Sequence, residues 1–204
     1  MIFPRNGFDD ELSRSFYQDF TACQRPEIFS AFSSFIEKER PSLVVEIGTC
    51  YGGLTKSLSD STKVHSIPFI TYDIAENESS ERLKKFNVDF RIENIFQETK
   101  VEEYTLKPYF LDYLLSVPSP VMILCDGGNK IGEFNAFAKV LRVGDILMAH
   151  DFSYEEEFFT AHSYWGWMEI QEKDIIGSMR KFHLSYYKMN IWSKLAWVCT
   201  KKIY

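Results

Sequence analysis

The chain has 204 residues, enough for one domain that buries about 70% of its unfolded surface without metal or disulfide staples. Aromatic residues make up 16% of the sequence, which excludes an intrinsically disordered protein because disordered chains are poor in aromatics. The 23 Lys and Arg against 29 Asp and Glu give a net charge of −6, so the chain lacks the broad basic face that non-specific binding of nucleic acid needs.

Cysteine usage and hydropathy indicate the compartment. The four cysteines have no CxxC spacing, which argues against a zinc ribbon, and they are too sparse for a disulfide scaffold. Residues 1–7 contain no apolar signal-peptide core, and no run of about 18 apolar residues occurs. We therefore expect a soluble cytoplasmic protein that makes no contact with a membrane.

Elements taken in chain order alternate between strands and helices. Residues 1–24 show no clear period, and apolar residues at helical spacing then predict a helix over 26–40, ended by Pro41. Strands are expected at 43–47, 69–74, 88–92, 121–126 and 145–151, and helices from Gly52, over 81–86, within 97–119 and over 131–141. Such alternation predicts an α/β fold with a Rossmann-like open sheet, mostly parallel, and helices on both faces.

The pattern changes after Asp151. Residues 152–181 are acidic and aromatic and are expected to be partly helical. Two alternating runs, 183–188 and 194–201, predict a C-terminal antiparallel strand hairpin with a short connection at a sheet edge. We divide the single domain 1–204 into an N-terminal helical cap (1–40), a cofactor-binding core (41–151), an acceptor-side insertion (152–181) and a closing hairpin (182–204).

Polar residues occur where the five predicted parallel strands end: Glu46, Asp73, Asn94, Asp126, and the pair His150 and Asp151. Of the amino-terminal ends of these strands, only that of 145–151 begins with an acid, Asp145. Ligands of open α/β sheets bind outside the carboxyl ends of the strands. The sequence therefore predicts a ligand site at this edge.

A glycine-rich turn follows the first of these strands, with the sequence Glu-Ile-Gly-Thr-Cys-Tyr-Gly-Gly over 46–53. Glycines there permit positive φ and close approach of a ligand, and the following helix presents N–H groups to an anionic part of it. A Walker loop needs Gly-Lys-Ser/Thr, and a dinucleotide fingerprint needs G-x-G-x-x-G. Neither spacing fits, whereas the pattern E/D-x-G-x-x-x-G-G does.

With these residues the sequence resembles the class I S-adenosylmethionine (SAM)-dependent methyltransferases. The resemblance rests on 45–53, on Asp73 twenty residues after Gly53, on Asn94, on Asp126, and on 144–151. It implies SAM as cofactor, with Asp73 on the ribose hydroxyls and Asn94 near the adenine. The implied cofactor-binding residues are Glu46, Gly48, Thr49, Cys50, Tyr51, Gly52, Gly53, Asp73, Asn94 and Asp126.

The ends of the fourth and fifth strands carry the candidate chemistry. Asp126, His150 and Asp151 are candidate ligands of a divalent cation. The resemblance to catechol-type and cephalosporin-hydroxylase-like O-methyltransferases implies Mg²⁺ there, although Lys130 and Phe152 depart from the pattern of those members. Without a metal, His150 is the natural base. The candidate catalytic residues are Lys130, His150 and Asp151.

The function expected from the resemblance is O-methylation of a small molecule or sugar, since no Asn/Asp-Pro-Pro segment follows the fourth strand. The aromatics Tyr164, Trp165 and Trp167 of the insertion either stack on the acceptor or pack as a cap. Two alternatives stay open: a catalytically silent cofactor-binding module and an NAD-dependent oxidoreductase on the same fold. The Phe-rich first helix and the closing hairpin permit a homodimer without requiring one.

Overall fold

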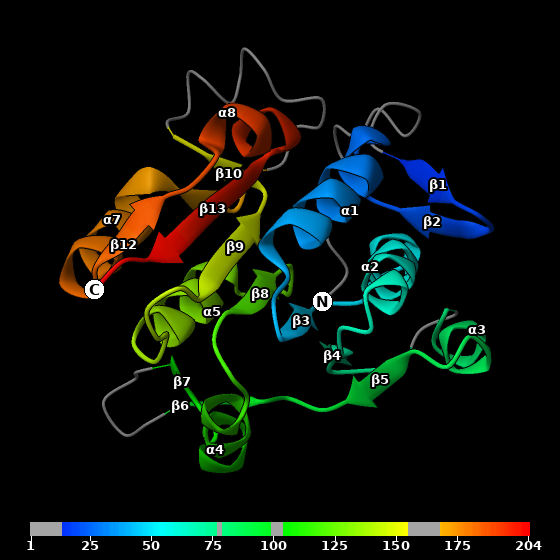
Figure 1. The fold of residues 1–204 in the computed structure, drawn as a ribbon, viewed down its shortest axis with the longest axis horizontal. Coiled ribbons are helices and arrows are strands. Elements are labelled where there is room, and N and C mark those ends of the chain that lie inside the picture. Colours follow the sequence, from blue (N-terminus) through cyan, green and yellow to red (C-terminus); the bar gives the residue numbers. More distant parts are fainter. Residues whose placement is uncertain (1–13, 77–78, 99–103, 155–167) are drawn as a thin grey trace.

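The computed structural model describes residues 14–76, 79–98, 104–154 and 168–204. Its central sheet has seven strands in the order β12-β13-β9-β8-β3-β4-β5 (Figure 1). These are β3 (Leu43–Ile47), β4 (Phe69–Asp73), β5 (Asp89–Ile92), β8 (Val121–Cys125), β9 (Ile146–His150), β12 (Leu184–Tyr186) and β13 (Trp197–Lys202). The first five are parallel to one another. At one end of the sheet β13 is antiparallel to β9, and β12 is antiparallel to β13. The predicted fold class is confirmed.

Helices cover both faces of the sheet and enclose two hydrophobic cores (Figure 1). One face carries α1 (Glu27–Glu39), α2 (Gly53–Val64), α3 (Ser80–Lys85) and α8 (Met189–Trp192). The other carries α4 (Pro108–Ser116), α5 (Lys130–Ala138) and α7 (Glu172–Lys181). Among the described residues no helix is long and apolar enough to cross a membrane.

Strand register explains how the ends of the strands meet. In β3 and β8 every residue is buried, as expected for strands covered on both faces, and their last residues, Ile47 and Cys125, are paired. Cys125 also pairs with Ala149 of β9. The glycine turn, Asp126 and His150 are therefore brought to one edge of the sheet.

The N-terminal segment differs from the expected helical cap. Residues 15–22 form a two-stranded hairpin of β1 (Ser15–Tyr17) and β2 (Phe20–Ala22), and only then does α1 begin, with Pro26 as its N-cap residue. The hairpin packs against α2 so closely that a Cβ on Gly53 would lie 2.5 Å from the carbonyl oxygen of Thr21. The short strands have too few residues to show a period, which is why the sequence did not reveal them.

Helical material is present within 97–119 as predicted, but it begins only at Pro108, with α4. Two short strands that were not expected from the sequence precede it: β6 (Phe96–Glu98) and β7 (Tyr104–Leu106) form a small antiparallel sheet. The rings of Phe96 and Tyr104 stack with centroids 4.7 Å apart across this pair. A cross-strand aromatic pair of this kind stabilises the two strands.

The C-terminal part begins with β10 (Phe152–Ser153) and β11 (Ile170–Gln171), which pair in parallel and lead into α7. The antiparallel pair of β12 and β13 is present as predicted, but a longer connection than expected joins the two strands. That connection holds α8 and a 3₁₀ turn, Ser193–Leu195, and buries Trp192 and Leu195 against α1.

Candidate functional site

A cavity of about 440 Å³ lies at the carboxyl edge of the sheet. The glycine turn, Asp73 and the ends of β8 and β9 line it, together with residues 21–24, which are the end of β2 and the two residues after it. Every predicted site residue except Asn94 is among the lining residues: Glu46, Gly48, Thr49, Cys50, Tyr51, Gly52, Gly53, Asp73, Asp126, Lys130, His150 and Asp151. The volume is in the range of pockets that hold one small molecule.

The glycine turn has the geometry that only glycine tolerates at two positions. Gly48 has φ of +91° and Gly52 has φ of +81°. A Cβ on Gly48 would lie 2.2 Å from the carbonyl oxygen of Asp126. Helix α2 then starts at Gly53 without a side-chain cap, and its first turn lines the cavity. The N-terminal end of a helix favours an anionic group of a ligand.

Asp73 ties the second strand to this turn. Its Oδ2 accepts hydrogen bonds from the backbone N–H of Thr49 (3.0 Å) and Cys50 (3.3 Å), and its Oδ1 accepts one from Ile74 (2.8 Å). The carboxylate thus shapes the turn and also lines the cavity beside it. An ionised carboxylate held this way can still accept a further pair of hydroxyl donors.

Glu46 lies beneath the turn and is 1% exposed. Its Oε2 accepts a hydrogen bond from Thr55 Oγ1 at 2.7 Å. Burial raises the pKa of Glu46 to about 8, despite the hydroxyl donors of Thr55 and Thr71 that lower it. At neutral pH Glu46 is therefore mostly protonated.

Asn94 is not brought to the cavity by the described structure. Its side chain is exposed, and its Oδ1 accepts a hydrogen bond from the backbone N–H of Phe96 (2.9 Å), where it shapes the entry to β6. A contact of Asn94 with adenine stays a prediction.

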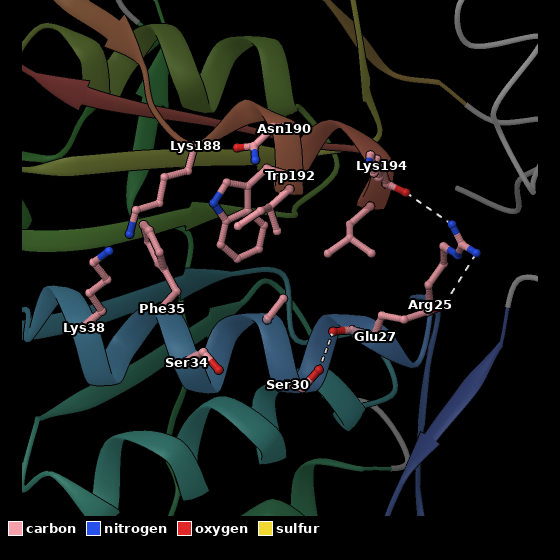
Figure 2. A pocket seen from close by; sticks show the side chains of 13 residues that line it. Arg25, Glu27, Ser30, Ser34, Phe35, Lys38, Lys188, Asn190, Trp192 and Lys194 are labelled. Carbon is pink, nitrogen blue, oxygen red and sulfur yellow. Dashed lines mark hydrogen bonds and ion pairs between the residues drawn. The ribbon is translucent and has the colours of Figure 1, made fainter.

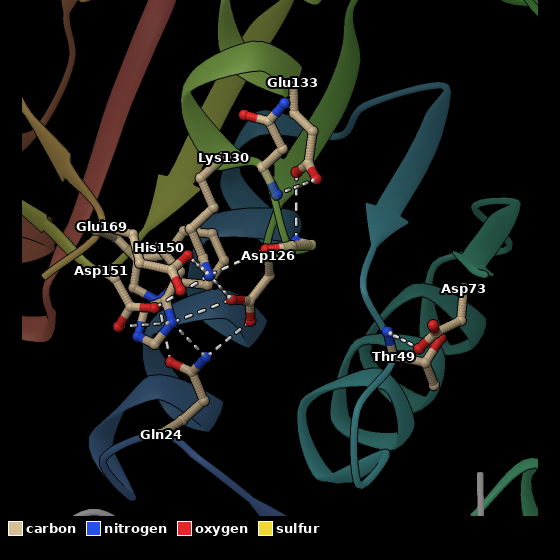
Figure 3. Close-up of polar contacts among 12 residues, drawn as sticks. Gln24, Thr49, Asp73, Asp126, Lys130, Glu133, His150, Asp151 and Glu169 are labelled. Atoms are coloured by element: carbon tan, nitrogen blue, oxygen red, sulfur yellow. Dashed lines mark hydrogen bonds and ion pairs between the residues drawn. The ribbon is translucent and has the colours of Figure 1, made fainter. Parts of the chain in front are cut away.

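The ends of β8 and β9 form one charged cluster with Lys130 at its centre (Figure 3). Lys130 Nζ lies 3.1 Å from Asp151 Oδ2, 3.7 Å from Asp126 Oδ1 and 2.5 Å from Glu169 Oε2. His150 Nδ1 lies 3.1 Å from Asp126 Oδ1 and 3.4 Å from Asp151 Oδ1. The four residues predicted from the sequence, Asp126, Lys130, His150 and Asp151, thus lie in one cluster, of which Glu169 is a fifth member.

The protonation of this cluster follows from its acids. Burial by itself lowers the pKa of His150, but the carboxylates of Asp151 and Asp126 outweigh burial and leave that pKa above its ordinary value. Burial likewise lowers the pKa of Lys130, and Asp151, Asp126 and Glu169 together raise it well above its ordinary value. Lys130 is therefore a permanent cation in this arrangement and not a proton acceptor.

The donor set of the cluster fits a divalent cation. Asp126, His150 and Asp151 each offer one ligand atom, and these atoms all lie within 4.8 Å of one another. The two carboxylates suit Mg²⁺ or Mn²⁺, whereas the imidazole is a more usual ligand of transition metals. The ammonium of Lys130 already contacts the two aspartates, so a metal ion would compete with it for their charge.

Three residues of the site were not predicted from the sequence. Glu169 precedes the two-residue strand β11, and Gln24 follows the hairpin, so neither belongs to a recognisable motif. Trp197 starts β13 opposite His150 and stacks near its ring, with centroids 4.9 Å apart. Its place in an antiparallel partner strand could be found only from the pairing.

The aromatics proposed to meet the acceptor, Tyr164, Trp165 and Trp167, lie outside the described residues. A second cavity, of about 670 Å³, lies between α1 and α8 (Figure 2). Phe35 and Trp192 form its apolar side, and Lys38 and Lys188 extend toward each other at one end. None of the predicted site residues lines it.

Comparison with solved structures places the fold among methyltransferases. A complex of CmcI with Mg and SAM matches with a TM-score of 0.61 and 14% identity, over 100% of this chain and 88% of that chain. A CmcI structure with SAH matches with a TM-score of 0.57 and 14% identity, over 98% and 94%. An O-methyltransferase family protein from Burkholderia thailandensis matches with a TM-score of 0.55 and 9% identity, over 87% and 55%.

No family model and no curated protein matches the chain by sequence. The likeness to the solved structures, all at low identity, therefore establishes the fold. This chain has the Rossmann-like fold of SAM-dependent O-methyltransferases.

Proposed function

We propose that this chain is a SAM-dependent methyltransferase that methylates an oxygen of a small molecule or sugar. The observation that carries the proposal is one cavity with the glycine turn and Asp73 on one side and the Lys130 cluster on the other. Two similar structures, of CmcI with Mg and SAM and of CmcI with SAH, support the choice of cofactor.

The residues divide into two groups by their chemistry. Asp73 is proposed to accept the two ribose hydroxyls, and Gly48, Gly52 and the first turn of α2 to let the backbone approach the cofactor. Glu46, buried beside the turn, has its pKa raised by burial, so an incoming cationic group would favour its ionised form. When bound, SAM supplies a methyl group on a positive sulfur.

Transfer requires the acceptor oxygen to lie behind the methyl carbon and to lose its proton. Transfer would form an O–C bond and break the C–S bond of the cofactor, and the proton of the acceptor would pass to a basic side chain. Where no metal ion is bound, His150 and Asp151 are the proposed proton acceptors. Lys130 is proposed to stay charged and to stabilise negative charge on the acceptor oxygen, because its pKa is raised by the acids around it.

A divalent cation is proposed at Asp126, His150 and Asp151, where it would hold and polarise the acceptor oxygen. The insertion over 152–181 is proposed to face the acceptor. We further propose a cytoplasmic location, which suits the free thiols of Cys23, Cys50, Cys125 and Cys199.

Calorimetric titration with S-adenosylhomocysteine (SAH), with and without Mg²⁺, tests the proposal. We expect micromolar binding by the wild-type chain and binding about 10–100-fold weaker by Asp73→Ala, because a charge-assisted acceptor is lost. Asp89→Ala is the matched control, since Asp89 is an exposed acid of the neighbouring strand that pairs with Arg91. Absence of SAH binding in both conditions would refute the proposal, and binding of NADH in its place would select the oxidoreductase alternative.

A further inference from the structure

Gln24 connects the N-terminal hairpin to the charged cluster. Its side chain is 4% exposed, and it lies against Asp126 and His150 on the side away from Lys130 (Figure 3). Gln24 Nε2 lies 3.0 Å from Asp126 Oδ2 and 3.2 Å from His150 Nδ1. One neutral side chain therefore contacts two of the three candidate metal ligands.

Trp197 determines which way the amide of Gln24 points. The indole Nε1–H can only donate, and it donates to Gln24 Oε1 at 3.1 Å. The carbonyl oxygen of the amide is thereby held on the Trp197 side, so its NH₂ group must face Asp126 and His150. The main chain is fixed as well, because Ser15 Oγ donates to the carbonyl oxygen of Gln24 at 2.6 Å.

This orientation separates the two oxygens of Asp126. Oδ2 receives the N–H of Gln24, whereas Oδ1 faces His150 Nδ1 at 3.1 Å and Lys130 Nζ at 3.7 Å. Rotation of the carboxylate would lose the Gln24 hydrogen bond at a site with little solvent to replace it. Oδ1 is thus kept turned toward the side where His150 and Lys130 lie.

We propose that Gln24 is a positioning residue that holds Asp126 Oδ1 and the ring of His150 in the arrangement needed for cation binding and methyl transfer, and that Trp197 acts through it. The role in methyl transfer rests on the proposed function. The positioning of the two side chains does not, because it follows from the contacts alone.

The test reads the imidazole of His150 directly. The chain has four histidines, so ¹⁵N-histidine labelling gives four ring systems, and loss of one in His150→Gln assigns the signal of interest. Spectra at pH 7.5 are compared for the wild-type chain, Gln24→Met and Gln24→Glu. Gln24→Met keeps similar bulk without hydrogen bonds, and Gln24→Glu keeps the acceptor for Trp197 but turns an oxygen toward Asp126 Oδ2.

We expect the His150 ring signals to shift in both variants and the other three histidines to keep theirs. Gln18→Met is the matched control, since Gln18 is an exposed glutamine bonded to Asp60 on the surface, and it should leave all four unchanged. Trp197→Phe should shift the His150 signals as well. The shift it causes should be smaller in the Gln24→Met background than in the wild-type chain, because only the direct contact between the two rings, at 4.9 Å, is then left to lose.

Unchanged His150 signals in Gln24→Met and Gln24→Glu would overturn the proposal. Additive shifts in the double variant would overturn the role given to Trp197. Titration with SAH keeps the two ideas apart: failure of the wild-type chain to bind SAH sinks the proposed function, while the ring signals still decide the role of Gln24.

Discussion

Replacement of Glu46 by Gln should make the chain more stable at neutral and alkaline pH. Glu46 is 1% exposed, and burial raises its pKa to about 8, against an ordinary value of 4.5. Gln has nearly the same shape, keeps an oxygen that can accept the Thr55 hydroxyl, and never ionises. The comparison of the two chains therefore isolates the cost of the buried charge.

The sign and size follow from proton linkage. Because the folded pKa lies above the unfolded one, the protonated carboxyl contributes its full stability below about pH 4.5, and this is lost as pH rises toward 8. At about 1.4 kcal/mol for each pKa unit, the wild-type chain should lose about 4 kcal/mol of unfolding free energy relative to Glu46→Gln between pH 5 and pH 8.5. The two chains should be close in stability at pH 5.

Urea unfolding followed by tryptophan fluorescence at both pH values measures the difference. Glu39→Gln is a control of opposite sign: burial raises the pKa of Glu39, but hydrogen bonds from Lys188, Tyr187 and Lys201 outweigh burial and lower it. That variant should lose stability relative to wild type above the ordinary pKa of a glutamate, not gain it. A wild-type chain that keeps the same stability relative to Glu46→Gln at pH 5 and pH 8.5 would refute the reasoning.

Three further substitutions test other parts of the molecule. Gly48→Ala should lower the unfolding free energy by about 2–4 kcal/mol and abolish SAH binding, because φ is +91° and the new Cβ would overlap the carbonyl of Asp126. Gly128→Ala is the control, since a Cβ there meets nothing within 4 Å. An equal loss of stability in both variants would contradict this explanation. Gly177→Ala, in the exposed middle of α7, should raise the melting temperature through a gain of about 0.5–1 kcal/mol, and a lower melting temperature would show a contact that is not seen. Asp73→Asn should lower the affinity for SAH, measured by calorimetry, about tenfold or more. Unchanged affinity would contradict the contact proposed between Asp73 and the cofactor.

The core of the fold could be predicted from the sequence because its signals are local. β3 and β8 are uninterrupted apolar runs, and the glycines of 48–53 mark the turn between strand and helix. Once parallel strands were expected, the carboxyl-edge rule placed Asp126, His150 and Asp151 together without any structure.

The parts that could not be predicted depend on pairing between distant residues. No sequence pattern marks Phe96 and Tyr104 as strand residues, and their pairing and stacking across β6 and β7 are seen only in the structure. Glu169 and Gln24 have no motif of their own and enter the cavity because β11 and the N-terminal hairpin are docked there. For the same reason the raised pKa of Lys130 could not be predicted, because the burial of its side chain among three acids depends on the tertiary structure.

The hairpin of β1 and β2 gives the cavity a wall that lies outside the central sheet. Gln24, at the end of that wall, is bonded to Asp126 and Trp197, which are 102 and 173 residues further along the chain. A molecule held between the hairpin and the sheet therefore joins segments whose contact costs chain entropy to make. Binding of such a molecule should therefore stabilise the contact between the hairpin and the sheet. Hydrogen exchange at the amides of β1 and β2 should slow on binding, by the factor 1 + [L]/Kd that the ligand concentration and its dissociation constant set.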